Sequence, residues 1–265
     1  MNLLLKSLPA LQCPACHGKF LPPPEAEALT CRGCGAVYPV LDGIIDFLPG
    51  RQRAVGLAQR LLENPLFVRI YEDYWRPWFT RFFTSQDFTE EGGWLQRHSP
   101  AGQDLLALDL ACGTGKYARY LADRYRSGMV FAADLSLPML RKGVELSRAR
   151  GLKNILFIRC DAHSLPFRDG ALNHGNCYGA MHLFADMEAA IGELARVTVA
   201  NGKMTAILLA AAGRRRLLQA VFSGLVRTSL IRTQVIEKIL EKAGFIRPDL
   251  HQDGLVLMIG ATRNP

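Results

Sequence analysis

The sequence predicts an α/β protein whose main domain is a largely parallel sheet with helices on both faces. From residue 105 onward, apolar strand-like runs alternate with helical patterns, which is typical of a parallel sheet. Four of the seven cysteines lie between residues 13 and 34, and aromatic residues crowd the segment that follows. We therefore expect a small N-terminal module in residues 1–50, a helical lid in residues 51–100 and the sheet domain in residues 101–265.

The composition excludes a disordered chain. Hydrophobic residues make up 49% and charged residues 21% of the 265 residues, which is globular composition. No apolar run approaches the ~18–20 residues of a membrane-spanning helix, and the N-terminus is a poor signal peptide, so we expect a soluble cytoplasmic protein. The net charge of +8 is concentrated after residue 200, whereas residues 1–50 hold three basic and four acidic side chains. The N-terminal module therefore lacks the basic surface typical of nucleic-acid binding.

Two Cys-x-x-Cys pairs predict a zinc site in this module. Zinc prefers a tetrahedron of thiolates, and four cysteines fill it without an open position, so the predicted metal is structural. An odd cysteine count with one tight cluster favours a metal over a disulfide framework. With the strand-like residues 38–48, the module resembles the zinc ribbons that partner tRNA and protein methyltransferases, and the ribbon that begins bacterial rRNA guanine methyltransferases. The predicted ligands are Cys13, Cys16, Cys31 and Cys34.

The segment between the module and the sheet predicts a helical lid. Pro65 and Pro77 divide it into at least two helices. Its aromatic residues either form an ordinary helix core or line a pocket for a flat or hydrophobic ligand. For the pocket we favour Tyr71 and Trp75.

The sheet domain follows a regular alternation of elements. Apolar runs predict strands, and segments with helical spacing predict the helices between them. Residues 171–184 are less apolar and predict a strand followed by a loop. The other predicted strands are 105–111, 129–136, 155–162, 202–211 and 255–263, and the predicted helices are 116–125, 138–151, 187–199 and 233–244.

The loop after the first of these strands is the most informative part of the chain. A hydrophobic strand ends in Asp109, and a run of small residues then opens a helix. Backbone must approach a ligand closely there, and the carboxylate would repel a pyrophosphate but can accept from a cationic amino-acid ligand. The loop resembles motif I of the class I S-adenosylmethionine-dependent methyltransferases, D-x-G-x-G-x-G, with Ala111 in place of the first glycine. That resemblance implies a Rossmann-like sheet and S-adenosylmethionine as cofactor, held by Asp109, Ala111, Cys112, Gly113, Thr114 and Gly115.

Two further acidic turns match the same family. Asp134 ends the second strand, where an acid can accept from both ribose hydroxyls. Asp161 follows the third strand, where the resemblance implies a bond to the adenine amino group, with Ala162 supplying a backbone N–H. The resemblance covers about residues 60–265, and with the ribbon the whole chain is similar to zinc-ribbon methyltransferases of bacteria and chloroplasts. Leu135, Met139 and Cys177 complete the predicted cofactor-binding residues.

Two residues after the fourth strand are candidates for catalysis. A sulfonium methyl group is already activated, so alignment of the acceptor is the main requirement, and a base is needed only if the acceptor loses a proton. His182 is the best base candidate, with a reference pKa near ~6.5, and it would also contact the substrate. Tyr178 would orient the substrate or the methionine carboxylate. For both residues, packing beside the cofactor is the alternative.

The basic C-terminal quarter predicts a second lid insertion near residues 212–232. Arg214 to Arg216 precede an apolar stripe in residues 217–226. This segment fits a lid or dimer helix, a helix at an anionic membrane surface, or a contact with RNA phosphates.

The sequence therefore favours a methyltransferase acting on a small aromatic or hydrophobic metabolite. The alternatives are a base methyltransferase of rRNA or tRNA that uses the ribbon for recognition, and a non-catalytic partner subunit of another methyltransferase.

Overall fold

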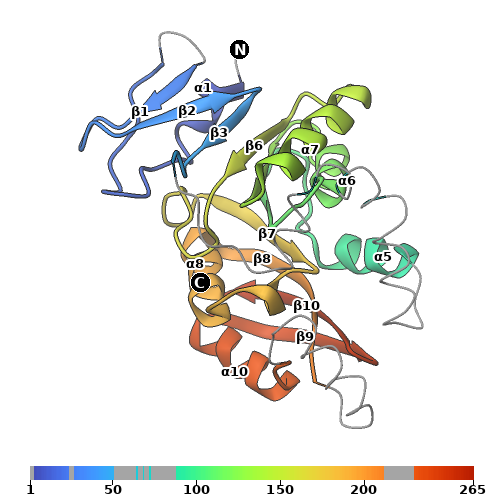
Figure 1. Cartoon of the computed structure of the whole chain (residues 1–265). Helices are drawn as coiled ribbons and strands as arrows, with labels where there is room; N and C mark the ends of the chain where they lie inside the picture. The colour runs from blue at the N-terminus through green and yellow to red at the C-terminus, as the bar shows by residue number, and fades with distance from the viewer. Residues whose placement is uncertain are drawn as a thin grey trace.

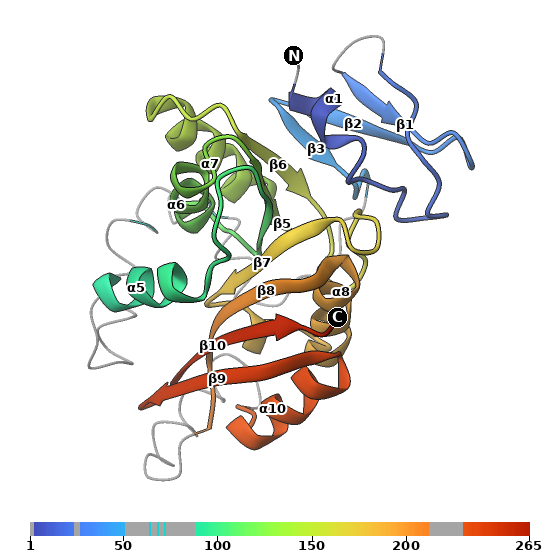
Figure 2. The same cartoon turned by 180° about the vertical axis from the view of Figure 1, so that it is seen from behind.

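One continuous sheet organises the molecule (Figures 1 and 2). The computed structural model describes residues 3–23, 27–50, 64, 68, 72, 88–211 and 230–265. Within these ranges the sheet has ten strands in the order β1-β2-β3-β6-β5-β4-β7-β8-β10-β9. The α/β fold class predicted from the sequence is confirmed.

The centre of the sheet is parallel and buried on both faces. Successive residues of its strands are buried without alternation, as in Val130 to Ala133, which is the pattern of strands covered on both sides. Because all five strands run the same way, their carboxyl ends meet at one edge. These strands are β4 (Leu106–Leu110), β5 (Met129–Asp134), β6 (Ile155–Arg159), β7 (Leu172–Tyr178) and β8 (Thr198–Leu209).

Helices cover the two faces unequally. The apolar sides of α5 (Phe88–His98), α6 (Lys116–Arg124) and α7 (Leu137–Ala149) share one buried cluster, and α8 (Met187–Val197) and α10 (Thr233–Lys242) share the other. The Ser136 hydroxyl accepts the N–H of Met139 and caps α7, with a proline in its first turn. Among the described residues, no helix combines the length and apolar character needed to cross a bilayer.

The far edge of the sheet is antiparallel. Strand β10 (Val256–Arg263) pairs with β8 on one side and with β9 (Phe245–Asp253) on the other. The sequence predicted β10 but not β9, because β9 carries a proline and many exposed polar residues. Both features suit an edge strand, which needs only one hydrogen-bonded side.

The N-terminal module is part of the same sheet. It contains α1 (Leu3–Ser7), β1 (Ala28–Thr30), β2 (Val37–Leu41) and β3 (Ile44–Asp46). Strand β3 pairs in parallel with β6, placing Ile44 beside Phe157, and Asp46 forms an ion pair of 3.1 Å with Arg159. The sequence predicted a separate module, and the structure adds that the module extends the main sheet by three strands.

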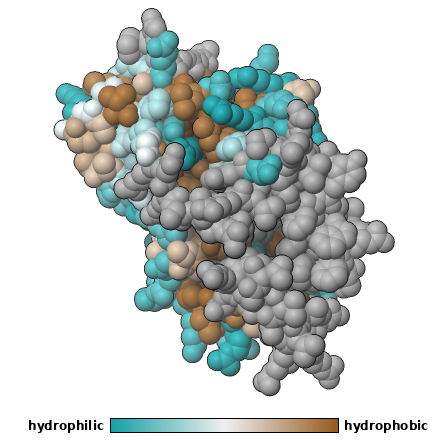
Figure 3. Space-filling view, viewed as in Figure 1, coloured by the Kyte–Doolittle hydropathy of each residue, from teal (hydrophilic) through white to brown (hydrophobic). Residues whose placement is uncertain are grey.

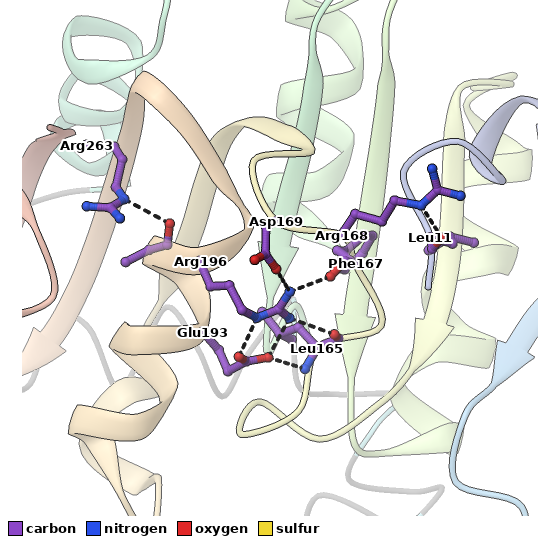
Figure 4. Close-up of polar contacts among 9 residues, drawn as sticks. Leu11, Leu165, Phe167, Arg168, Asp169, Glu193, Arg196 and Arg263 are labelled. Atoms are coloured by element: carbon purple, nitrogen blue, oxygen red, sulfur yellow. Dashed lines mark hydrogen bonds and ion pairs between the residues drawn. The ribbon is translucent and has the colours of Figure 1, made fainter. Parts of the chain in front are cut away.

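A second contact holds the module against the loop after β6 (Figure 4). Arg196 near the end of α8 donates to both carboxylate oxygens of Glu193, at 2.7 and 2.8 Å, and to Asp169 at 2.7 Å. It also donates to the backbone carbonyls of Phe167 and Leu165.

The neighbouring Arg168 donates to the carbonyl of Leu11 in the module, at 3.2 Å. Arg196 therefore fixes the loop on which the module rests.

Candidate functional site

The four predicted zinc ligands converge on one point. The Sγ atoms of Cys13, Cys16, Cys31 and Cys34 all lie within 4.8 Å of one another, with 3.8 Å between Cys13 and Cys34 and 3.4 Å between Cys16 and Cys31. A tetrahedral zinc with Zn–S bonds of ~2.3 Å separates its sulfurs by about 3.8 Å. A disulfide would need about 2.05 Å. The spacing therefore fits four thiolates around one zinc ion.

The surroundings of the Cys31 sulfur also suit a thiolate. A Cβ atom on Gly18 would lie 3.1 Å from the Cys31 sulfur, so glycine lets the backbone approach. The N–H of Gly33 donates to the same sulfur at 3.3 Å. Desolvation opposes ionisation of Cys31, but the N–H groups of Cys34 and Gly33 outweigh it and lower its pKa to about 6. The adjacent His17 is an exposed turn residue with φ of 58°. The apolar residues Leu21, Val37 and Leu41 of the module are exposed. Figure 3 shows brown, hydrophobic side chains on the surface of the N-terminal module.

The glycine loop between β4 and α6 adopts the conformation that its small residues predict. Gly113 and Gly115 have φ of 55° and 75°, and Ala111 has φ of 53°. This left-handed region costs a residue with a Cβ atom about 1–2 kcal/mol, which explains why the related motif has glycine at the position of Ala111. Gly143 in α7 lets that helix approach the loop, since a Cβ atom there would lie 3.0 Å from the carbonyl of Thr114.

Asp134 lies at the carboxyl end of β5 and is tied to this loop. Its Oδ2 accepts the N–H of Gly113 at 2.7 Å, and its Oδ1 accepts the N–H of Ser136 at 2.8 Å. Burial raises the pKa of Asp134, although these N–H groups oppose the shift. Nearby Leu135 is half-buried and Met139 is buried. The acid is thus held where β5 meets the glycine loop.

Asp161 follows β6 and is held by His163. Its Oδ1 accepts the backbone N–H of His163 at 3.1 Å and contacts the ring Nδ1 at 2.7 Å. The other ring nitrogen accepts the N–H of Asp186 at 3.3 Å, so neutral His163 carries its proton on Nδ1 and donates to Asp161. Ala162 is half-buried beside it. The sequence analysis missed this role of His163.

Asp109 is the penultimate residue of β4 and is buried, with 1% of its surface exposed. Its Oδ1 accepts from the side-chain amide of Asn176 at 2.7 Å. Asn176 lies directly beside Asp109 on the neighbouring strand β7. Asn176 is not among the site residues predicted from the sequence, although a polar residue in the middle of a buried strand is an available signal.

The two catalytic candidates lie just beyond and at the end of β7. His182, in the short helix η2 (Met181–Leu183), is 8% exposed, and its Nδ1 accepts the N–H of Leu209 at 3.3 Å. Burial lowers the pKa of His182 to about 4, so neutral His182 carries its proton on Nε2 and presents a donor there. Tyr178 is buried against Tyr117, with ring centres 4.6 Å apart. Cys112 and Cys177 are also buried, and burial raises the pKa of both thiols.

The aromatic segment lies mostly outside the described residues, and so do Tyr71, Trp75 and residues 212–229. Glu72 is described and contacts the glycine loop. It accepts from the Thr114 hydroxyl at 2.6 Å and pairs with Arg119, which is 1% exposed. Desolvation opposes ionisation of Glu72, but Thr114 and Arg119 outweigh it and lower its pKa. Glu72 therefore connects the segment before the sheet domain to the loop, a link that the sequence analysis missed.

Two sequence families match the chain. The family described as "Methyltransferase domain" matches residues 107–202, and the family described as "Trm112p-like protein" matches residues 5–43. The first match covers the glycine loop, the three acidic turns and His182. The second covers the four converging cysteines. The methyltransferase resemblance and the N-terminal ribbon predicted from the sequence are confirmed.

Curated relatives share the methyltransferase domain. A demethylmenaquinone methyltransferase of Thermus thermophilus is 40% identical over 100 residues, covering 38% of this chain and 45% of the relative. An uncharacterised chloroplastic methyltransferase of Arabidopsis thaliana is 26% identical over 209 residues, covering 72% of this chain and 59% of the relative. The protein named "Probable tRNA methyltransferase 9B" of Bos taurus is 33% identical over 113 residues, 42% of this chain and 22% of the relative. The chain thus spans less than two thirds of the length of each relative.

Solved structures show the same fold. The phosphoethanolamine N-methyltransferase 2 of Haemonchus contortus, solved with phosphomonomethylethanolamine and S-adenosylhomocysteine, superposes with a TM-score of 0.60 at 15% identity. The superposition covers 67% of this chain and 53% of the other.

Proposed function

We propose that this chain, which joins a Trm112p-like module to a class I methyltransferase fold, transfers a methyl group from S-adenosylmethionine to a small aromatic or hydrophobic acceptor. The observation that carries the proposal is the placement of three carboxylates at the carboxyl ends of three neighbouring strands. Asp109 is the penultimate residue of β4, Asp134 is the last residue of β5, and Asp161 follows β6 by two residues. The left-handed glycine loop lies between the first two of these acids along the chain. Open α/β sheets bind their ligands at this edge.

Each part of the methyl donor has residues of suitable chemistry. Asp109 can accept from the cationic amino group of the methionine portion. Asp134, the acid tied to the glycine loop, can accept from the ribose hydroxyls. Asp161, held by His163, can accept from the adenine amino group, with the N–H of Ala162 beside it. Residues of the loops, of strand β7 and of the first turn of α7, most of them with small or apolar side chains, complete the proposed site: Ala111, Cys112, Gly113, Thr114, Gly115, Leu135, Met139 and Cys177.

The bound donor supplies an activated methyl group, so the protein's own residues must mainly orient the acceptor. His182 presents its Nε2–H as a hydrogen-bond donor, because Leu209 occupies its Nδ1. For His182 to act as a base, its ring must give up the Leu209 contact and change tautomer. We therefore propose that His182 orients the acceptor. Tyr178, which packs against Tyr117, is proposed to orient the acceptor or the methionine carboxylate. Tyr71 and Trp75 remain the proposed pocket residues.

A small hydrophobic acceptor is favoured by two observations. The Thermus thermophilus relative is named a demethylmenaquinone methyltransferase, and quinones are flat and apolar. The segment from Tyr71 to Phe83 is rich in aromatic residues that can stack on such a ring. We further propose that the four cysteines of the module hold one structural Zn²⁺, and that this metal takes no part in the reaction.

Transfer to an RNA base is the second candidate. It is favoured by the relative named tRNA methyltransferase 9B and by the basic C-terminal quarter. The slightly acidic module speaks against RNA recognition by the ribbon itself. A non-catalytic subunit that docks another methyltransferase is the third.

Radiolabelled S-adenosylmethionine distinguishes these candidates. The purified protein is incubated separately with the lipid-soluble small molecules and with the RNA of bacterial cells, and the label is counted in each fraction. We expect label in the lipid-soluble fraction. Label in RNA alone would establish the second candidate, and cofactor binding without transfer to either fraction would support the third. Failure to bind S-adenosylhomocysteine in calorimetry would overturn all of the cofactor assignments.

A further inference from the structure

A chain of polar side chains crosses an otherwise apolar face of the sheet. Its five members are at most 1% exposed. Tyr125 lies at the end of α6, and the others come from β7, β8 and β4. The contacts are Tyr125 Oη to His174 Nδ1 at 3.1 Å, His174 Nε2 to Thr205 Oγ1 at 2.9 Å, Thr205 Oγ1 to Asn176 Oδ1 at 2.8 Å and Asn176 Nδ2 to Asp109 Oδ1 at 2.7 Å.

Strand register explains how residues distant in sequence meet. Asn176 pairs with Asp109 on one side and with Thr205 on the other, so three side chains lie in a row across three parallel strands. His174 precedes Asn176 by two residues and therefore points to the same face. The five side chains thus connect the C-terminal end of α6 to the carboxyl group of Asp109 in β4.

The direction of every hydrogen bond in this chain follows from its Asp109 end. The amide nitrogen of Asn176 donates to the Asp109 carboxyl group, and the amide oxygen of Asn176 accepts from the Thr205 hydroxyl. The Thr205 hydroxyl then donates to Asn176 and must accept from Nε2–H of His174. That leaves Nδ1 of His174 as the acceptor for the Tyr125 hydroxyl. Burial lowers the pKa of His174 to about 3, which keeps the ring neutral as this arrangement requires.

A buried chain of hydrogen bonds of this kind has only one arrangement in which every donor faces an acceptor. Reversing one member would place two donors or two acceptors against each other among buried groups, which costs more than the bond itself contributes. The orientation of Asp109 is therefore determined by groups as far away as Tyr125. Since the hydrogen bonds of these residues end on Asp109, their influence should be specific to the part of a ligand that Asp109 contacts.

We propose that Tyr125, His174, Thr205 and Asn176 are positioning residues that hold the Asp109 carboxylate in one orientation toward the amino-acid portion of the methyl donor. This inference rests on the proposed function and adds to it a selective determinant of amino-acid recognition that lies inside the sheet. Asp109 touches the ligand, and the four other residues act through it.

The test uses Thr205 because substitution by valine or by serine removes its hydroxyl and its methyl group separately. Thr205→Val keeps the shape but removes the hydroxyl, whereas Thr205→Ser keeps the hydroxyl and removes a methyl group. Calorimetry measures the affinity of each full-length variant for S-adenosylhomocysteine and for 5′-methylthioadenosine, which lacks the amino-acid portion. Losing one hydrogen bond in a chain that ends on a charge is expected to weaken S-adenosylhomocysteine about tenfold in Thr205→Val. We expect methylthioadenosine to change less than twofold, and Thr205→Ser to bind both ligands like the wild type.

Other results would contradict the proposal. Equal weakening of both ligands in Thr205→Val would indicate a general structural role, and unchanged S-adenosylhomocysteine affinity would remove the positioning role. If the wild type binds neither ligand, the proposed function itself fails, and this outcome is distinct from the other two.

A second measurement does not depend on ligand binding or on a variant that folds. Long-range ¹H–¹⁵N NMR of the wild type at pH 7 reports the tautomer of His174, and we expect the proton on Nε2. A proton on Nδ1 would overturn the direction of the chain and with it the proposal.

Discussion

The cysteine module and the carboxyl edge of the sheet reach their geometry by different routes. In the module, one short segment supplies all four sulfurs, which lie within 4.8 Å of one another. At the carboxyl edge, each carboxylate comes from a different strand, and buried contacts such as Asn176 to Asp109 orient it. Both regions use glycine to bring backbone N–H groups to a charge. The comparison shows that a local ligand set can define a site by itself, whereas a site assembled from strands depends on the packed core behind it.

The largest expected effect is loss of the module when its ligands are removed. Structural zinc in small modules contributes about 10–16 kcal/mol of apparent binding free energy. We expect Cys31→Ser, or chelation of the wild type, to unfold residues 13–48 and to leave the central strands folded. Hydrogen exchange followed by mass spectrometry measures both regions.

The control for this experiment is Cys112→Ser, which alters a buried cysteine outside the cluster and should leave exchange in residues 13–48 unchanged. Because β3 pairs with β6, we also expect faster exchange in β6 of Cys31→Ser. Slow exchange throughout the module after zinc removal would contradict the thiolate site.

Low pH should lower the free energy of unfolding of the sheet domain through its two buried histidines, His174 and His182. The pKa of His182 is lowered to about 4 and that of His174 to about 3, both by burial. The unfolded chain therefore binds protons that the folded state does not. Stability is retained above about pH 6.5 and falls as the pH drops from there toward 4. From pH 7 to pH 5 the expected loss is about 2 kcal/mol for each histidine.

Urea unfolding at several pH values measures this loss. Between pH 7 and pH 5, the free energy of unfolding of His182→Asn should fall by about half of the amount that the two histidines together produce in the wild type. Because acid also releases zinc, the difference between the two proteins is the informative quantity. If the free energy of unfolding depends on pH identically in both proteins, His182 has the same pKa in the folded and unfolded states, which would contradict the prediction.

Asp134→Asn tests the acid tied to the glycine loop. The variant keeps the size of the side chain but removes the charge that accepts from Gly113 and Ser136. We expect S-adenosylhomocysteine to bind about tenfold more weakly, because hydrogen bonds to a charged acceptor contribute about 1.5–3 kcal/mol. The exposed Asp123→Asn in α6 is the matched control and should bind like the wild type. Undiminished affinity in Asp134→Asn would exclude the ribose role.

The smallest expected effect concerns the backbone of the glycine loop. Ala111 and Gly113 have nearly the same left-handed φ, 53° and 55°. Relieving the strain at Ala111→Gly should raise the free energy of unfolding by up to about 1 kcal/mol, and Gly113→Ala should lower it by about the same amount. Urea midpoints measure both changes. Changes of equal sign would show that packing rather than backbone conformation dominates at this loop.

Much of the fold and of the candidate site could be predicted from local sequence patterns. The cysteine spacing, the small-residue loop after an apolar strand and the acids that end β4 and β5 are each encoded within a few neighbouring residues. Hydrophobic periodicity likewise predicted the central strands and helices. Strand β9 was missed because an edge strand needs no continuous apolar run.

Only the tertiary structure decided which distant residues act together. The pairing of β3 with β6 joins the module to the sheet, and the register of β4, β7 and β8 aligns Asp109, Asn176 and Thr205. The tautomers of His163, His174 and His182 follow from partners elsewhere in the chain. The sequence alone determined which chemical groups are present and on which elements they lie. Their orientation depends on packing and hydrogen bonds between residues far apart along the chain, which no local pattern encodes.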